Sequence, residues 1–216
     1  MTGTPGDTGT LAGTVVGTIT KRRARTRQRL LDAALDVFAE EGFGRSTVEQ
    51  VCERAGFTRG AFYSNFSSLD ELFLALWEER SARMLTDLRA ALARLDPAGP
   101  EATVRAAIDA TPLDEAWYRI TAEFTAHALR TPGLRRVMTA REHAIREAIL
   151  PVFVTALERL GRRVPDEEAL GDALVAVHDG TAVQVLMQPD DEAVRARRQA
   201  LFMHVLNAYS TPRETP

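Results

Sequence analysis

The sequence contains a single cysteine and no long apolar run. With Cys52 alone, no internal disulfide can form. No stretch approaches the roughly 20 apolar residues that a membrane-spanning helix needs. The N-terminus also lacks the basic start and the apolar run of a secretory signal. These absences favour a protein of the reducing cytoplasm.

The sequence also lacks the motifs of common enzyme chemistry. It has no Gly-rich phosphate loop, nucleophile elbow or paired-carboxylate motif. His127, His143, His178 and His204 fall on different expected helices, without the i, i+4 spacing of a helical zinc site. Cys52 lies on an apolar helix face, which favours a buried core residue over a sensor thiol. We expect no catalysis, cofactor or metal, with an enzyme built on a helical bundle as the alternative.

Positive charge is concentrated near the N-terminus. Residues 1–65 carry nine Lys and Arg against seven Asp and Glu, whereas the rest carry eighteen against twenty-three. A stripe without any acid consists of Lys21, Arg22, Arg23, Arg25, Arg27 and Arg29. A basic stripe on an otherwise acidic protein suits contact with phosphate. A solvated charge run would show the same pattern.

Apolar residues recur at helical spacing, and no useful stretch alternates as a half-buried strand does. Thr and Gly dominate residues 1–20, which bury too little surface to offset ordering entropy, so we expect a disordered tail there. Pro151 should kink or split a long helix, and residues 211–216 should be loose. The fold class is all-α, with nine to ten helices and no strands, over residues 26–41, 48–55, 59–66, 69–95, 101–110, 111–130, 131–160, 166–187 and 190–209.

Two short helices, 48–55 and 59–66, are expected to form a helix-turn-helix, the minimum DNA-reading unit. Thr47 and Gln50 have the spacing of a capping box. Gly56 can adopt the left-handed conformation that a sharp turn needs, and Thr58 can cap the second helix. An ordinary helical hairpin would show the same pattern.

The second helix of this pair has distinct inner and outer faces. Phe57, Phe62 and Phe66 can face inward and hold it against the first helix. Arginine and asparagine can pair with base edges, and tyrosine and serine hydroxyls suit phosphates. The residues left facing outward are Arg59, Gly60, Tyr63 and Ser64, with Asn65 near the edge.

The residues themselves resemble a known family. Leu30–Phe43, Ser46-Thr47, Ala55–Phe66 and Leu69–Leu72 are similar, with intact spacing, to the N-terminal region of TetR-family transcriptional regulators. The resemblance implies an all-helical homodimer with an N-terminal DNA-binding domain, which we call the reading head, and a divergent C-terminal ligand-binding domain.

The same resemblance implies roles for individual residues. Thr47 and Tyr63 would contact phosphate, whereas Arg59 and Gly60 would approach bases. With the basic arm, the predicted DNA contacts are Lys21, Arg22, Arg23, Arg25, Thr47, Arg59, Gly60, Ala61, Tyr63, Ser64 and Asn65.

Two positions depart from the family pattern. Asn65 stands where the family usually has histidine, and Leu69 stands where it usually has a lysine that meets backbone phosphate. The missing lysine removes one expected contact and suggests that the arm from Lys21 to Arg29 carries more of the affinity.

We assign residues 21–67 to DNA binding and residues 68–210 to ligand binding and dimerisation. An aromatic cavity with a few polar groups is typical of an apolar small-molecule site. Each candidate taken singly is explained as well or better as core. The candidate cavity residues are Trp117, Tyr118, Phe124, His127, Met138, His143, Phe153 and His178.

The last two helices are expected to pack against their copies in a two-fold four-helix bundle. Gly180 costs stability within a helix, and a close helix crossing at a dimer seam would explain it. The candidate interface residues are Leu174, Val177, Gly180, Thr181, Leu201 and Val205.

The predicted function is a cytoplasmic homodimeric repressor that binds a roughly palindromic operator and leaves it when a small, largely apolar ligand binds. A DNA-binding protein with a filled, ligandless core is the remaining alternative.

Overall fold

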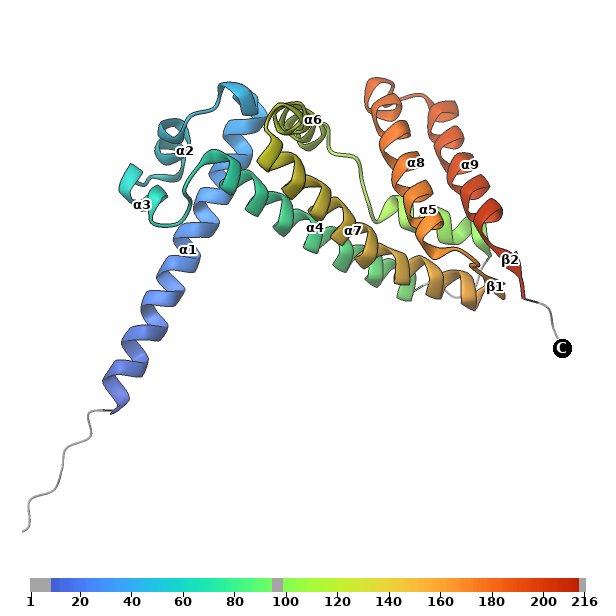
Figure 1. The fold of residues 1–216 in the computed structure, drawn as a ribbon, viewed down its shortest axis with the longest axis horizontal. Coiled ribbons are helices and arrows are strands. Elements are labelled where there is room, and N and C mark those ends of the chain that lie inside the picture. Colours follow the sequence, from blue (N-terminus) through green and yellow to red (C-terminus); the bar gives the residue numbers. More distant parts are fainter. Residues whose placement is uncertain (1–8, 95–98, 214–216) are drawn as a thin grey trace, which may run out of the picture. The chain divides into compact units, whose positions relative to one another are not determined.

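The computed structural model describes residues 9–94 and 99–213, and these are mostly helical (Figure 1). This confirms the all-α class. The chain divides into two compact units, residues 1–78 and 79–216. In the described part of the chain, no helix combines the length and apolar character that crossing a membrane requires.

Unit 1 contains α1 (Gly9–Glu41), a short 3-10 turn η1 (Phe43–Arg45), α2 (Val48–Ala55), α3 (Arg59–Tyr63) and the start of α4 (Leu69–Ala93). Its core is aromatic. The ring of Phe43 lies 5.2 Å from that of Phe38 and 5.7 Å from that of Phe73. These contacts tie α1, η1 and α4 together around a buried interior.

The first helix is longer than expected. It begins at Gly9, so residues 9–20 continue a helix instead of forming the expected disordered tail. Once the later residues have nucleated the helix, each added residue gains a hydrogen bond at little further cost. Residues 1–8 of the expected tail lie outside the described residues.

The caps of α2 were predictable from sequence. The Thr47 hydroxyl accepts from the Gln50 N–H at 3.2 Å, and the Gln50 side chain accepts from the Thr47 N–H at 2.8 Å. Gly56 ends the helix in the left-handed region, with φ 68° and ψ 38°. Both bounds of α2 therefore agree with the prediction.

The third helix ends earlier than predicted, at Tyr63 instead of Phe66. Ser64 and Asn65 donate their side-chain hydrogen bonds to the carbonyl of Ala61, each at 2.8 Å. Short polar side chains that bond nearby carbonyls compete with continued helix.

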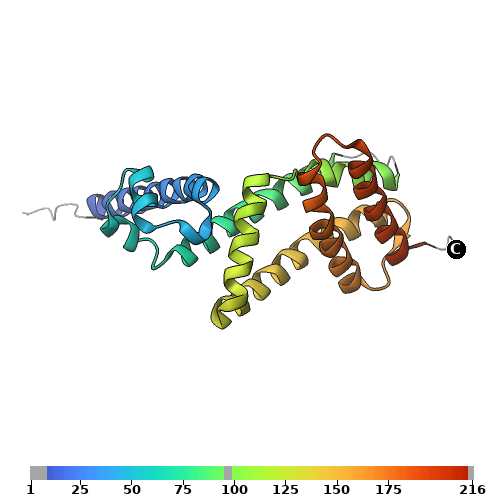
Figure 2. The ribbon, with the colours of Figure 1, turned by 90° about the horizontal axis from the view of Figure 1, so that it is seen from above.

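Unit 2 holds the rest of α4 followed by α5 (Pro100–Asp109), α6 (Glu115–Arg130), α7 (Pro132–Arg159), β1 (Arg162–Arg163), α8 (Glu167–Met187), α9 (Glu192–Tyr209) and β2 (Thr211–Pro212). Asp114, Asp166 and Asp191 cap α6, α8 and α9. Successive helices from α6 to α9 pack in pairs, and α5 packs on α9 (Figure 2).

One apolar cluster joins α4, α5, α7, α8 and α9. Its largest members include Phe153 and Phe202, and the fully buried Leu157 and Leu170 lie among them. Burying such side chains is worth roughly 1.5–3 kcal/mol each. This cluster holds unit 2 together.

Three expectations for unit 2 were wrong. The described residues include one strand pair, with Arg162 opposite Pro212 and Arg163 opposite Thr211. The start of the expected loose tail is therefore held in place, and the Arg213 N–H also donates to the Gly161 carbonyl at 2.8 Å. Residues 214–216 of that tail lie outside the described residues.

Of the two outcomes expected at Pro151, a kink or a split, the split does not occur: α7 continues as one helix past this proline. Pro151 is exposed, while Phe153 and Leu157 of the next turn are buried in the core cluster. Burial of these side chains offsets the one backbone hydrogen bond that proline removes.

The third wrong expectation, after the absence of strands and the loose start of the tail, is the start of α6, which begins at Glu115 and not at Thr111. The Thr111 hydroxyl instead bonds to the Ala107 carbonyl at 2.8 Å, at the end of α5.

Candidate nucleic-acid interface and effector domain

Buried phenylalanine rings support the helix-turn-helix from its inner side. Phe62 is fully buried and Phe66 is 2% exposed, and their ring centroids lie 6.0 Å apart. At the turn, the Phe57 N–H donates to the Cys52 carbonyl at 2.9 Å. The pKa of the Cys52 thiol is raised, mainly by burial. This supports its assignment as a core residue, and the opposite face of α3 is left for contact with a partner.

Three arginines of the basic stripe hold this domain together. Arg29 donates to the Ala55 carbonyl at 2.6 Å, and its guanidinium lies 4.7 Å from the Phe57 ring centroid. Arg27 lies 4.8 Å from the Phe66 ring centroid. Arg23 donates to the Ser64 carbonyl at 3.1 Å. The stripe was predicted as a DNA-binding arm, but half of it has internal partners.

The other three cations of the stripe, Lys21, Arg22 and Arg25, are exposed. Among the residues that the structure describes, none of these three side chains has a bonded partner. They keep the role of candidate phosphate contacts. Sequence could not separate the two groups, because charge alone does not show which aromatic ring or carbonyl lies nearby.

Arg59 and Tyr63 lie together on the outer face of α3. The Arg59 guanidinium is 5.9 Å from the Tyr63 ring centroid, and Tyr63 is 51% exposed. Hydrogen bonding to Tyr63, followed by the charge of Glu49, raises the pKa of Arg59. The structure therefore brings together two residues that the sequence placed on the DNA face.

Glu49 of α2 is a member of this surface that the sequence did not reveal. Its Oε1 lies 2.6 Å from Nη1 of Arg59, and both side chains are more than half exposed. The sequence did hold a signal for this contact, because Glu49 follows the N-cap Thr47 by two residues and faces the start of the next helix. A carboxylate therefore lies beside an arginine that is a candidate for base contact.

The remaining residues of the predicted reading face differ in their accessibility. Gly60 is exposed, and an added Cβ would have its nearest contact at 3.8 Å, so the backbone there is open to close approach. Thr47 and Ser64 are also exposed, while Ala61 is half-buried.

Asn65 is half-buried, and its Nδ2 donates to the carbonyl of Ala61. Its Oδ1 is buried and meets no donor in the described part of the chain. Asn65 is therefore turned away from the reading face on which it was predicted.

The candidate ligand residues of unit 2 have different surroundings. Phe124 is fully buried, with the His127 ring 5.9 Å away. Trp117 packs under Arg80, whose guanidinium lies 4.7 Å from the Trp117 ring and 2.7 Å from Asp114. Phe153 belongs to the apolar core cluster. The shared aromatic cavity remains a prediction.

The other candidates are also scattered. Met138 is buried and Tyr118 is half-buried. His143 is exposed and lines a hollow between α7 and α8. A helical stripe of aromatic and Met residues in the sequence shows which face of a helix points inward. It does not show whether neighbouring side chains fill the space on that face or leave a cavity.

His178 bonds to a buried arginine that the sequence did not single out. Arg198 is 4% exposed and donates to the Thr181 hydroxyl at 2.6 Å, the His178 carbonyl at 3.2 Å and His178 Nδ1 at 3.0 Å. A guanidinium can only donate, so His178 is neutral with its proton on Nε2. Burial, and then the charge of Arg198, lowers the pKa of His178 to about 4.

A sequence signal for Arg198 did exist. Val194, Phe202 and Leu206 share its helical stripe at intervals of four and are all buried. A lone arginine in such a stripe is expected to be buried with it.

Most of the expected dimer residues face the protomer's own core. Leu174 and Thr181 are each 5% exposed, and Val177 and Val205 pack against the core cluster. Leu201 is half-buried. Gly180 alone is exposed, with nothing within 4 Å of an added Cβ. The sequence pattern assigned the most apolar face of these two helices to contact with a second copy, but the residues of this face pack within the protomer.

A different face of α8 and α9 is apolar and exposed. We define the exposed hairpin face by its members Gly180, Met187, Ala193, Ala196 and Ala200. Met187 is 76% exposed, the largest exposure among the large apolar side chains given for the described residues. An exposed apolar face of this kind is typical of a protein–protein contact.

Comparison with known proteins gives two family matches. The tetR family of bacterial regulatory proteins matches residues 30–76, and the C-terminal domain of BetI-type transcriptional repressors matches residues 98–209. The regulator AcrR of Shigella flexneri is 40% identical over 60 residues, which are 27% of this chain and 28% of AcrR. That alignment spans less than a third of AcrR.

Solved structures cover most of the chain. A transcriptional regulator from Rhodococcus sp. Rha1 is 26% identical, with a TM-score of 0.61 over 88% of this chain and 99% of that one. SmeT, solved in complex with triclosan, is 24% identical, with a TM-score of 0.61 over 89% of this chain and 99% of that one. On the strength of the two family matches, the chain belongs to the TetR family of bacterial regulatory proteins.

Proposed function

We propose that the protein is a sequence-specific, DNA-binding transcriptional repressor that acts as a homodimer in the cytoplasm. It leaves its operator when a small, largely apolar molecule binds unit 2. The exposed pair Arg59 and Tyr63, on an α3 held by the buried Phe62, is the observation that carries this proposal. The family name of the C-terminal match, a transcriptional repressor, supports repression.

DNA recognition combines two kinds of contact. Arg59 of α3 reads a base edge in the major groove, where arginine pairs best with guanine. Tyr63 and Thr47 contact phosphates, and Lys21, Arg22 and Arg25 add contacts that do not depend on sequence. Asn65 acts within the protein, closing the end of α3.

The second copy packs on the exposed hairpin face of α8 and α9. A two-fold axis through this face would present two reading heads to a roughly palindromic site. The apolar members of the face are small except Met187, so helices of the two copies can approach closely.

Release follows from differential binding. A ligand that favours a conformation whose heads are wrongly spaced for the operator shifts the population away from DNA. SmeT, whose fold this chain shares, was solved with triclosan, a small molecule. A regulator of this kind makes no covalent change, so we propose no catalytic role.

The test is operator binding by the purified full chain, measured by fluorescence anisotropy with genomic fragments that begin with DNA beside its own gene. Affinity should fall steeply as salt rises, because phosphate contacts release counterions. Arg59→Ala should relax preference at particular base pairs at a cost of about 1–3 kcal/mol. The triple variant Lys21→Ala, Arg22→Ala, Arg25→Ala should weaken all sequences alike.

Arg105→Ala, an exposed arginine of α5 in unit 2, serves as the control and should change neither property. DNA binding that does not depend on salt would show that this assignment of DNA contacts is wrong. So would an equal loss of affinity for all sequences in both Arg59→Ala and the triple variant.

A second candidate is a DNA-binding protein without an effector. The buried Phe124 and Phe153, which were expected to line a cavity, support it. A screen of small molecules by thermal stabilisation separates the two candidates, because any ligand that binds only the folded state raises the melting temperature.

A further inference from the structure

A hollow of about 820 Å³ lies between α7 and α8 of unit 2. Its volume lies within the range of about 300–1,000 Å³ that small-molecule sites occupy. Ala140, Val175 and Ala176 contribute apolar lining, and Val175 is 37% exposed. Three arginines contribute positive charge: Arg135, Arg136 and Arg146. We call this hollow the α7–α8 groove.

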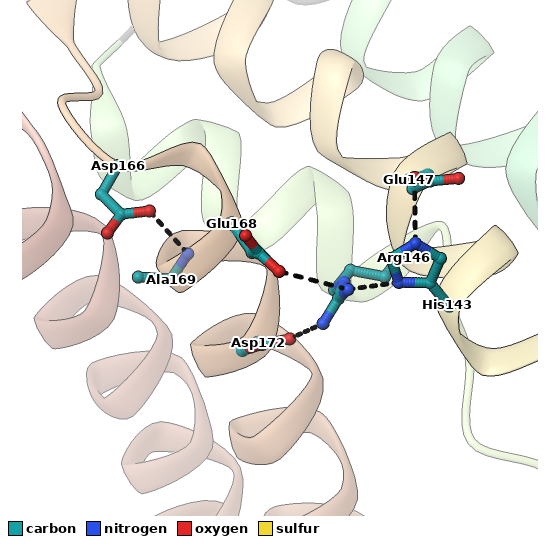
Figure 3. A network of polar contacts seen from close by, with 7 residues as sticks. All are labelled: His143, Arg146, Glu147, Asp166, Glu168, Ala169 and Asp172. Carbon is teal, nitrogen blue, oxygen red and sulfur yellow. Dashed lines mark hydrogen bonds and ion pairs between the residues drawn. The ribbon is translucent and has the colours of Figure 1, made fainter. Parts of the chain in front are cut away.

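One arginine of the groove is already neutralised. Arg146 bonds to Asp172 and lies 3.9 Å from Glu168, both on α8 (Figure 3). Its stem passes over Gly171, where an added Cβ would lie only 3.0 Å from the Arg146 Cγ. This arginine therefore fastens α7 to α8 and forms one end of the groove.

A histidine lies beside Arg146 in this network. Nδ1 of His143 is bonded to Arg146, and its Nε2 lies 3.0 Å from Glu147 Oε1 (Figure 3). His143 therefore has partners on α7 itself.

The positive charge at the other end is less well matched. Arg135 donates to the Leu129 carbonyl, which carries no full charge. Arg136 is exposed, and no acceptor bonds it within the described ranges 9–94 and 99–213. Glu142 also lines the groove, and burial, followed by the charge of Asp179, raises its pKa.

We propose that the α7–α8 groove is the effector site and that the effector is an organic monoanion with an apolar chain. The anionic group pairs with Arg135 and Arg136, and the chain lies along Ala140, Val175 and Ala176. This proposal rests on the repressor function proposed above and names the class of its ligand. A neutral hydrocarbon would leave the arginines unmatched, and a cation would be repelled by them.

Three probes of equal chain length test the class of ligand on the full chain: decanoate, 1-decanol and decyltrimethylammonium, each below its aggregation limit. Isothermal titration calorimetry should show saturable binding of decanoate. Binding of 1-decanol should be at least about tenfold weaker, because one charge-assisted contact is lost. The ammonium probe should not bind. Equal binding of decanoate and decanol would overturn the proposed class.

Variants test the position of the site. Arg136→Ala should weaken decanoate binding about tenfold, and Ala176→Trp should abolish it by filling the groove. Arg105→Ala removes an exposed arginine outside the groove and should leave binding unchanged. If all three variants bind decanoate like the wild type, the site lies elsewhere and the inference is wrong.

Operator binding by the same samples without any probe keeps the two proposals distinct. If the variants lose decanoate binding but still bind the operator, the result concerns the groove alone. If the protein binds no operator at all, the repressor proposal is the one that fails. Sedimentation of Ala176→Trp provides the last check. If this variant is monomeric while the wild type is dimeric, a second copy occupies the groove, and the inference is overturned.

Discussion

At the scale of single residues, the pairing of Glu49 with Arg59 sets the character of the reading face. Both side chains are exposed, and an exposed ion pair contributes no more than about 1 kcal/mol. A phosphate or base can therefore displace Glu49 at small cost, but its negative charge stays close to the DNA backbone.

We predict that Glu49→Gln binds DNA several-fold more tightly, because it removes a repulsive charge and releases Arg59. Fluorescence anisotropy at two salt concentrations measures the change, which should shrink at high salt. Glu40→Gln breaks an exposed pair with Arg54 between α1 and α2 and is the matched control, expected to leave affinity unchanged. Weaker binding by Glu49→Gln would instead mean that Glu49 positions Arg59 for base contact.

Arg29 and Arg25 should behave differently although they are only four residues apart on the same helix. Arg29→Ala loses the bond to the Ala55 carbonyl and the contact with Phe57, so we expect a loss of about 1–3 kcal/mol in the free energy of unfolding. Arg25→Ala should leave stability unchanged and weaken DNA binding. Urea unfolding followed by circular dichroism measures both variants, and equal stability of the two would contradict the assignment.

The residue types on the reading face were predictable, but their partners were not. Arg59 and Tyr63 face outward because Phe62 must face inward on the same short helix. The inward turn of Asn65 depends on the Ala61 carbonyl, which becomes available only where α3 ends. Such a contact requires the folded backbone and cannot be inferred from the type of residue.

At the scale of helices, the pair α8 and α9 is joined through Arg198 and His178. As pH falls below the ordinary histidine value of 6.5, the unfolded chain takes up a proton that folded His178 resists until its pKa of about 4. Stability contributed by neutral His178 is therefore complete above about pH 6.5 and is lost as pH falls toward 4. Burial raises the pKa of Asp179 and Glu142, which opposes this loss at the acid end.

We predict that His178→Gln has a flatter stability profile between pH 7 and pH 5. The Gln carbonyl can still accept from Arg198, but it cannot be protonated in this range. Urea unfolding at pH 7, 6 and 5 should show the wild type losing up to about 2 kcal/mol over this range, because the unfolded chain gains a proton that folded His178 does not. His204→Gln, an exposed position on α9, is the control. Parallel profiles for wild type and His178→Gln would contradict this account.

Helix positions followed from local signals where caps were strong. The bounds of α2 are set by Thr47 and Gly56, both visible in sequence. The strand pair of β1 and β2 was not visible, because it depends on Arg162 reaching Ser210 across 48 positions of the chain. Long-range partners of this kind leave no local periodicity.

At the scale of the whole molecule, the exposed hairpin face makes a prediction about assembly. Ala196→Glu places a charge on this face, so the protein should become monomeric with unchanged helicity and should lose operator binding. Ala122→Glu places the same charge at an exposed position of α6 and should stay dimeric. Analytical ultracentrifugation distinguishes them. A dimeric Ala196→Glu would show that the copies meet through another surface.

The family and the fold class could be predicted from sequence, because the helix-turn-helix occupies a continuous run of residues. The surfaces proposed for the effector and for the second copy were not indicated by the sequence, because the strongest apolar stripe of α8, with Leu170 and Leu174, fills the protomer's core. The surface left for partners is made of smaller residues such as Ala196 and Gly180. A search for interface residues by hydrophobicity alone would place Ala196 and Gly180 below the core residues.

The internal partners of Arg23, Arg27 and Arg29 have a consequence for protein engineering. A hybrid regulator that borrows only residues 47–66 would leave behind the arginines that close the end of α2 and cover Phe57 and Phe66. Its transplanted helices would be loosely held even if every base-contacting side chain were present. The smallest portable recognition module of this protein therefore begins at Arg23, well before its first helix-turn-helix residue.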